Sequence, residues 1–227
     1  MFNHQDVPFV PIERESIEGV RYYKVFGTEK LVRMPSITSV ISWRNRNKFK
    51  KWRARVGEQE ANNITRKATH RGTDAHTLIE EYLNNSPTFT DVLPLSQYLF
   101  KQAKPTLDRI DNILCQEQAL WSFELGIAGS VDCIAEFDDE LSIIDFKTSK
   151  EPKPREWIED YFVQCAAYAC MLYEMKGLIV KKFVIIMTCE NGDVEVYEEY
   201  DKKKYINLLS KYVREFVEFK LQEYAKA

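Results

Sequence analysis

Apolar residues recur at helical spacing through much of the first half of the chain. The clearest case is the segment 71–87, whose apolar residues fall on one face of a helix that Thr73 or Asp74 is expected to cap. It closes a mostly helical region that begins near Ser36, a candidate cap behind Pro35. A proline-punctuated stretch, about 94–114, is also predicted to be helical. Before these, a hairpin turning at Gly27–Thr28 is expected within residues 21–34.

The pattern changes at residue 115 to short apolar runs that predict strands. Three strands, one helix (155–175), two more strands and a closing helix (about 203–224) are expected in that order. This order predicts an α/β or α+β protein with a central sheet and a helical N-terminal elaboration. We expect a single domain over 1–227, with residues 1–114 as the elaboration, 115–200 as the core and 201–227 as a final helix.

Composition narrows the class of protein. The chain has 227 residues, of which 44% are hydrophobic and 30% charged, as in soluble globular proteins. No apolar run approaches the roughly 20 residues that cross a bilayer, and the first residues lack the features of a secretory or organellar leader. We therefore expect a cytoplasmic protein. Its five cysteines form no C-x-x-C pair, which favours reduced core thiols over a zinc or iron–sulfur site.

Charge is distributed unevenly, although the net charge is only −3. Residues 44–71 contain ten Lys or Arg and two Glu, a local net charge of +8 that favours a polyanion-binding face. Trp43, Phe49 and Trp52 interleave with these basic residues, as single-stranded nucleic acid prefers. The alternative is a solvated helix whose two tryptophans face the core.

The run "LSIIDFKTSK" ends a predicted strand with Asp145 and Lys147, which project from the same side of it. A short turn at Asp138–Asp139 would place Asp132 of the preceding strand opposite Asp145. Two facing carboxylates repel unless a cation lies between them, and such pairs suit Mg²⁺ or Mn²⁺. Lys147 would then stabilise the negative charge of a phosphodiester transition state. The alternative is an ordinary solvated strand end.

A third element lies on the predicted helix 71–84. His76 and Glu80 are four residues apart and share one side of it, at the margin of the apolar face. Taken alone, such a histidine is more often a satisfied residue at the edge of the core.

Together these motifs resemble the PD-(D/E)xK nuclease superfamily in its RecB-like branch. The pattern there is a helix bearing His, a strand with G-x-x-D, a D-x-K strand and a helix with Q-x-x-x-Y. All four occur here in order, as His76, Asp132, Asp145–Lys147, and Gln164 with Tyr168. Within that branch the chain is similar to the mitochondrial genome maintenance exonuclease family and its phage-encoded relatives, over about residues 35–200.

The resemblance implies a mixed β-sheet of the restriction-endonuclease-like type, flanked by helices, and assigns roles to residues. His76, Asp132, Asp145 and the carbonyl of Phe146 would bind one or two Mg²⁺ or Mn²⁺ ions, with Lys147, Asp145 and Asp132 as the catalytic residues. No iron–sulfur cluster is implied, because the four-cysteine set of some relatives is absent. Residues expected to contact DNA or support the site are Glu80, Glu117, Thr148, Gln164, Tyr168, Arg44, Arg46, Lys50, Lys51, Trp52, Arg53 and Arg71.

The implied activity is metal-dependent exonucleolytic hydrolysis of DNA, in replication, recombination or repair. The expected substrate is single-stranded DNA, or DNA with a free end, and the expected setting is the cytoplasm of a bacterium, if the gene is carried by a phage. A monomer without membrane attachment is expected. Two alternatives stay open: a structure-selective endonuclease on the same fold, and a non-catalytic subunit that binds DNA ends.

Overall fold

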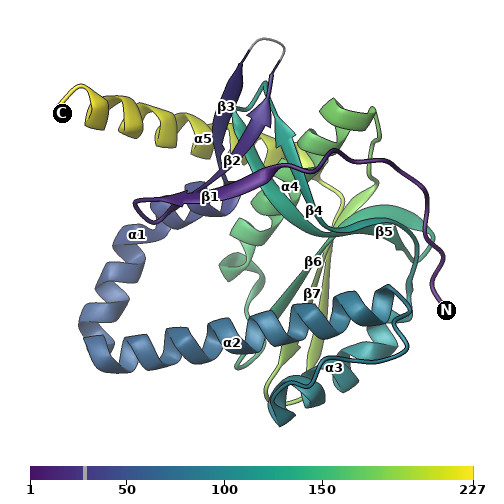
Figure 1. Ribbon diagram of the computed structural model, residues 1–227. Helices are drawn as coiled ribbons and strands as arrows, with labels where there is room; N and C mark the ends of the chain where they lie inside the picture. The colour runs from purple at the N-terminus through teal and green to yellow at the C-terminus, as the bar shows by residue number, and fades with distance from the viewer. Residues whose placement is uncertain (28–29, 227) are drawn as a thin grey trace.

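A five-stranded mixed sheet forms the centre of the computed structural model, which describes residues 1–27 and 30–226 (Figure 1). Its strand order is β4-β5-β6-β7-β8, with β6 and β7 parallel and the other neighbours antiparallel. This confirms the predicted fold class. The strands are β4 (Ile110–Ser122), β5 (Ile127–Phe137), β6 (Glu140–Ser149), β7 (Lys182–Cys189) and β8 (Val194–Glu199).

Helices cover both faces of this sheet because its central strands are apolar on both sides. On one face α4 (Glu159–Lys176) packs against residues such as Val131 and Ile143, and α5 (Lys202–Tyr224) packs on α4. On the other face α2 (Glu58–Leu83) and α3 (Pro94–Leu107) pack against Ile144 and Phe146. Three of the five cysteines are buried, as expected of core thiols.

The N-terminal residues form a second, smaller sheet of β1 (Glu13–Ile17), β2 (Val20–Phe26) and β3 (Leu31–Pro35). The predicted hairpin corresponds to β2 and β3, although Thr28 of its expected turn lies outside the described residues. Strand β1 was not predicted, because "ERESI" is exposed on both sides and lacks a hydrophobic alternation. Tyr23, Val25 and Met34 dock this sheet on Ala128 of β5.

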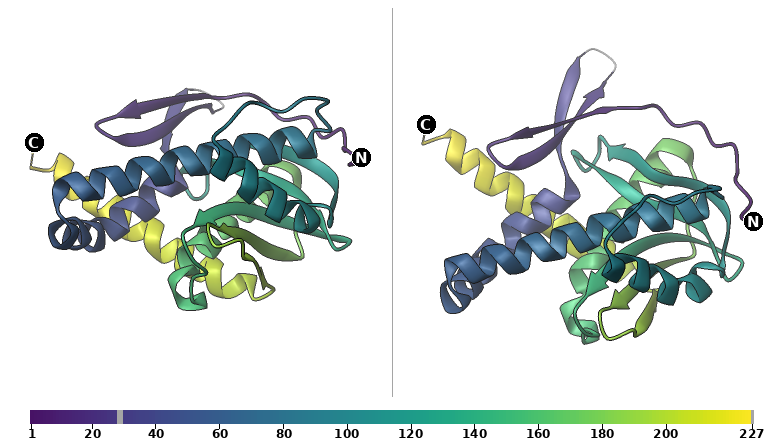
Figure 2. Two further views of the ribbon diagram at one scale, coloured as in Figure 1. Left: turned by 90° about the horizontal axis from the view of Figure 1, so that it is seen from below. Right: turned by 60° about the horizontal axis from the view of Figure 1, so that its bottom comes forward.

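Helix α1 (Ile37–Val56) and the first part of α2 extend away from the main sheet and meet at Gly57, whose φ of 93° breaks the helix (Figures 1 and 2). The predicted Ser36 cap is confirmed, since its side chain accepts a hydrogen bond from Ser39 N. The predicted cap at Thr73 or Asp74 is wrong. Helix α2 starts fifteen residues earlier, in a polar stretch whose lack of apolar periodicity hid it.

Two further boundaries differ from the prediction. Helix α3 ends at Leu107, and β4 begins at Ile110 rather than at residue 115, because a register shift and the positive φ of Asn112 disguise the strand pattern. The helix expected from residue 155 opens as a short 3₁₀ turn, η1 (Arg155–Trp157), before α4. Trp157 of this turn is 72% exposed. Across the described ranges, no helix combines the length and apolar character needed to span a bilayer.

Close packing of α4 on the sheet depends on Gly129. A Cβ at that position would lie 2.8 Å from the ring of Tyr168, which is itself buried. We expect Gly129→Ala to lower the free energy of unfolding by about 1–3 kcal/mol, because overpacking a dense core is costly. Chemical denaturation measures this difference. Gly72→Ala is the matched control: a Cβ there would meet Thr148 Oγ1 at 4.0 Å, an ordinary contact distance, and the better helix propensity of alanine should raise stability by about 0.5–1 kcal/mol. An unchanged Gly129→Ala variant would contradict the packing argument.

Candidate active site

The hairpin of β5 and β6 sets the two aspartates side by side. Its ladder runs from Phe137–Glu140 to Cys133–Ile144, the register predicted from the turn, and both turn residues have positive φ. Where the ladder ends, Phe146 N donates to Asp132 Oδ2 at 2.9 Å. The Asp132 carboxylate therefore lies directly beside the Asp145–Lys147 segment.

Asp145 is a buried carboxylate with one free oxygen. Its side chain is 1% exposed, Oδ1 accepts from Lys147 Nζ at 2.5 Å, and Oδ2 has no partner among the residues described. Burial raises the pKa of Asp145 to about 7 although the Lys147 ammonium opposes this. A buried, unpaired carboxylate oxygen is rare without a cation or water beside it.

Lys147 links the two carboxylates. Its Nζ is 4.0 Å from Asp132 Oδ2 and 3.4 Å from the Phe146 carbonyl oxygen. Burial lowers the pKa of Lys147, but the charges of Asp145 and Asp132 more than offset it, so the pKa lies above its ordinary value. The lysine is therefore a fixed positive charge at neutral pH.

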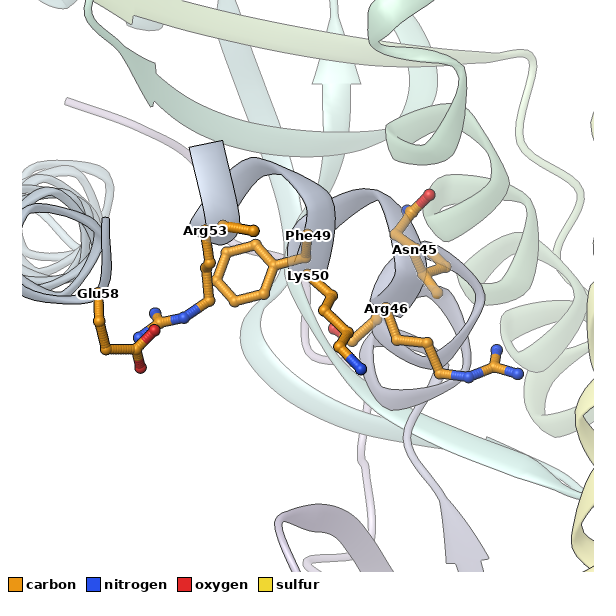
Figure 3. Close-up of a pocket in the computed structure, with 9 residues that line it drawn as sticks. Asn45, Arg46, Phe49, Lys50, Arg53 and Glu58 are labelled. Carbon is orange, nitrogen blue, oxygen red and sulfur yellow. The ribbon is translucent and has the colours of Figure 1, made fainter. Parts of the chain in front are cut away.

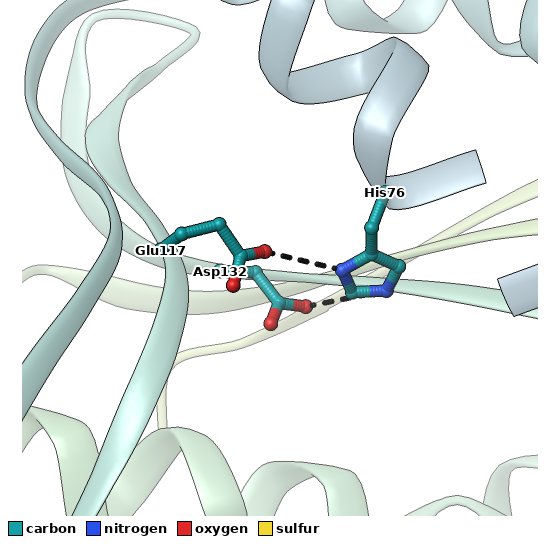
Figure 4. Close-up of side chains that lie close together, drawn as sticks. All are labelled: His76, Glu117 and Asp132. Carbon is teal, nitrogen blue, oxygen red and sulfur yellow. Dashed lines mark hydrogen bonds and ion pairs between the residues drawn. The ribbon is translucent and has the colours of Figure 1, made fainter. Parts of the chain in front are cut away.

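His76 reaches the same point from α2 and faces different partners with its two nitrogens (Figure 4). Nε2 is 3.0 Å from the Phe146 carbonyl oxygen and 3.9 Å from Asp132 Oδ2, whereas Nδ1 is 3.4 Å from Glu117 Oε1. Burial lowers the pKa of His76, but the nearby Asp132 and Glu117 carboxylates more than offset this effect and raise the pKa to about 9. The histidine predicted from helical spacing thus faces the hairpin carboxylates, and it is not simply part of the core edge.

These groups fit a divalent cation. Ligand atoms of His76, Glu117 and Asp132 lie within 4.8 Å of one another, and the Phe146 carbonyl oxygen is 3.0 Å from His76 Nε2. A nitrogen with several oxygens suits Mg²⁺ or Mn²⁺, and a cation would give Asp145 Oδ2 the partner it lacks.

An arginine ties α2 to the strand that carries the D-x-K segment. Arg71 Nε donates to Thr148 Oγ1 at 3.1 Å, and its guanidinium pairs with Glu190 in the β7–β8 turn. Arg71 is thus only slightly exposed, and one turn later the same helix presents His76. Glu80, one turn after His76, has a raised pKa, because of partial burial first and then the charge of Glu117.

Gln164 and Tyr168 lie behind the site within the core. Gln164 Nε2 donates to the Tyr168 hydroxyl at 3.3 Å, and both side chains are buried. Of the two roles expected for them, the burial of Tyr168 is compatible with support and not with contact to DNA. Tyr161 was not among the expected site residues, but the centre of its ring lies 5.2 Å from Lys147 Nζ. It lies three residues before Gln164 and seven before Tyr168, on the same face of α4, and this spacing could have indicated it.

The basic stretch divides into a structural part and an exposed part. Trp43 packs on Phe216 and Phe219 of α5, and the neighbouring Arg44 pairs with Glu215, so these two residues join α1 to α5. Arg46 stacks on Trp43. Trp43 therefore packs inside the protein, as the alternative interpretation of the basic stretch expected of both tryptophans.

The rest of that stretch borders a pocket of about 680 Å³ on α1 (Figure 3). Phe49, which is 47% exposed and stacked with Trp52, forms an apolar wall beside Lys50. Arg53 is held by Glu58 across the bend between α1 and α2. Lys50 and the exposed Lys51 form no ion pair within the described ranges.

A family model described as the PD-(D/E)XK nuclease superfamily matches residues 48–225. The chain belongs to this superfamily. The membership expected from the motifs is confirmed, and it supports a nuclease function; enzymes of the superfamily use divalent metal ions.

Curated relatives in this superfamily include mitochondrial genome maintenance exonuclease 1, a likeness that the sequence motifs had indicated. The Xenopus tropicalis protein is 47% identical over 55 residues, 23% of this chain and 15% of that protein. The human protein is 26% identical over 131 residues (53% and 38%), and the mouse protein 28% over 112 residues (47% and 33%). The chain thus spans less than two fifths of the length of each.

Two solved structures are similar at lower levels. A Eubacterium rectale protein provisionally named an exonuclease is 16% identical, with 64% of this chain and 63% of that one covered and a TM-score of 0.43. A protein designated SSO0001 is 15% identical, with 74% and 70% covered and a TM-score of 0.40. We base no inference on either similarity.

Proposed function

We propose that this chain is a divalent-metal-dependent DNA exonuclease that hydrolyses phosphodiester bonds, preferentially in single-stranded DNA. The observation that carries the proposal is that ion-pair distances link His76 to Asp132, Asp132 to Lys147 and Lys147 to Asp145, whose other carboxylate oxygen is buried and has no partner among the described residues. Superfamily membership and the exonuclease relatives support it.

In this proposal His76 Nε2, the two carboxylates and the Phe146 carbonyl would hold Mg²⁺ or Mn²⁺. A bound divalent ion supplies Lewis acidity and lowers the pKa of water that it binds. The chain's own contribution is to fix these oxygens on two paired strands, so that little reorganisation is needed during the reaction. The hairpin register provides this rigidity, since it holds Asp132 against the backbone of Phe146.

Lys147 is assigned to charge stabilisation. Its ammonium lies beside Asp145 and Asp132, whose charges favour its protonated form. The ammonium can donate hydrogen bonds to a phosphate oxygen on which negative charge develops. The assignment agrees with its place beside both carboxylates.

DNA contact is assigned to the exposed part of α1. Lys50 and Lys51 offer positive charge that no acidic side chain offsets among the described residues, and the exposed face of Phe49 next to them is suited to base stacking. Such a surface binds without reading sequence, as an exonuclease requires.

The activity is tested by digesting single-stranded DNA labelled at either end, with each end free or blocked, in Mg²⁺ or EDTA. We expect Mg²⁺-dependent shortening from a free end. Lys147→Ala and Asp145→Ala should each lower the rate by about 10²–10³-fold, since each removes a preorganised charge, and should leave DNA binding nearly unchanged.

Lys150→Ala is the matched control, because it removes an exposed lysine that follows the same strand and should retain activity. Cleavage that persists in either site variant would contradict the assignment. Cleavage of circular single strands would favour the endonuclease alternative, and binding without any cleavage would favour the non-catalytic subunit.

The DNA-contact assignment is tested with Lys50→Glu/Lys51→Glu. Each lost phosphate contact on single strands lowers the salt slope by about 0.7, so the double variant should bind more weakly and reduce the slope of log Kd against log salt by about 1.4. Fluorescence anisotropy over a salt series measures both quantities. Lys181→Glu/Lys203→Glu, which changes one exposed lysine directly before β7 and one in the first turn of α5, is the control and should bind nearly as the wild type does. Equal effects of the two double variants would show that α1 is not the contact surface.

A further inference from the structure

Glu117 adopts a left-handed backbone conformation in the middle of a strand. Its φ is 45°, while its neighbours keep one register, Gln116 opposite Cys133 and Gln118 opposite Val131. The register shift of β4 lies elsewhere, between Asp111 and Cys115, so no inserted residue accounts for this conformation. Such a conformation is costly for a non-glycine residue and persists where the surroundings enforce it, often at functional sites.

The carboxylate of Glu117 faces the candidate metal site and approaches the outer nitrogen of His76, Nδ1. Its Oε1 is 3.4 Å from His76 Nδ1, and its side chain is 38% exposed. The inner nitrogen, Nε2, faces the Phe146 carbonyl and Asp132 instead. Glu117 and Asp132 therefore approach the imidazole at different nitrogens (Figure 4).

A neutral imidazole binds a metal through one nitrogen only when the other nitrogen carries the proton. A carboxylate acceptor at Nδ1 favours the Nδ1–H form, which leaves the lone pair of Nε2 directed at the cation. Carboxylate–histidine–metal arrangements of this kind are general, and loss of the outer carboxylate typically weakens metal binding by about 10–100-fold.

We propose that Glu117 is a positioning residue that fixes the tautomer and ring orientation of His76 for metal binding through Nε2. The inference rests on the proposed function, because it presumes a divalent ion between His76, Asp132 and Asp145. It goes further by giving the strained residue of β4 a defined role. The left-handed turn of the backbone is maintained because it delivers a carboxylate to His76 Nδ1.

A double-mutant cycle in Mn²⁺ binding tests this, with Mn²⁺ titrated into the full chain without DNA and free ion followed by EPR. Glu117→Gly should weaken binding by about 10–100-fold in the wild-type background and by less than about twofold in the His76→Ala background, because Glu117 acts through His76. An equal loss in both backgrounds would make Glu117 a direct ligand and overturn the proposal, as would no loss in either.

The Glu117→Gly exchange also separates function from folding. Glycine accepts the left-handed conformation at no cost, so the denaturation midpoint should be at least that of the wild type while metal affinity falls. Asn112→Gly is the matched control, since Asn112 has a φ of 47° on the same strand and binds Glu136 rather than the site; its Mn²⁺ affinity should be unchanged. A lower midpoint for Glu117→Gly, with affinity lost in proportion, would assign Glu117 a structural role only.

Asp145→Ala distinguishes failure of this inference from failure of the proposed function. If Asp145→Ala abolishes Mn²⁺ binding while Glu117→Gly preserves it, only the role of Glu117 is wrong. If the wild type binds no Mn²⁺, or Asp145→Ala binds it equally well, the proposed metal site itself is wrong, and the role of Glu117 with it.

Discussion

The burial of the Asp145 carboxylate is the constraint on which the rest of the site depends. Removing a charge from water costs several kcal/mol, and a single ion pair with Lys147 repays only part of that cost. The uncompensated cost of burial raises the pKa of Asp145, and Oδ2 is the carboxylate oxygen that has no partner among the described residues. Without a cation, the cost of burying this negative charge is only partly offset. A bound cation would offset the rest.

Three layers of the fold contribute to this site. The β5–β6 hairpin supplies both carboxylates and the lysine in a fixed register, and α2 supplies His76 from the other direction. Arg71 secures α2 to Thr148, directly after the D-x-K segment. Behind the sheet, Tyr168 packs closely on Gly129 and supports the strand that carries Asp132. The distances between the site residues therefore depend also on packing contacts that lie outside the site.

The sequence was most informative where local chemistry determines geometry. The Asp138–Asp139 turn defined a hairpin register, and that register placed Asp132 beside Asp145. It was least informative where tertiary contacts decide. The charged strand β1 has no hydrophobic alternation, α2 continues through a polar stretch, and Trp43 is covered by α5 despite its place among basic residues. The backbone of Glu117 belongs to the same group, because nothing in its local sequence favours a positive φ.

The central claim is that these residues form one divalent-metal site, and anomalous scattering from crystals soaked in Mn²⁺ tests it most directly. The account predicts a principal peak about 2.1 Å from His76 Nε2, the Phe146 carbonyl oxygen and one oxygen each of Asp132 and Asp145. A peak bound elsewhere, or no peak at these residues at saturating Mn²⁺, would contradict it.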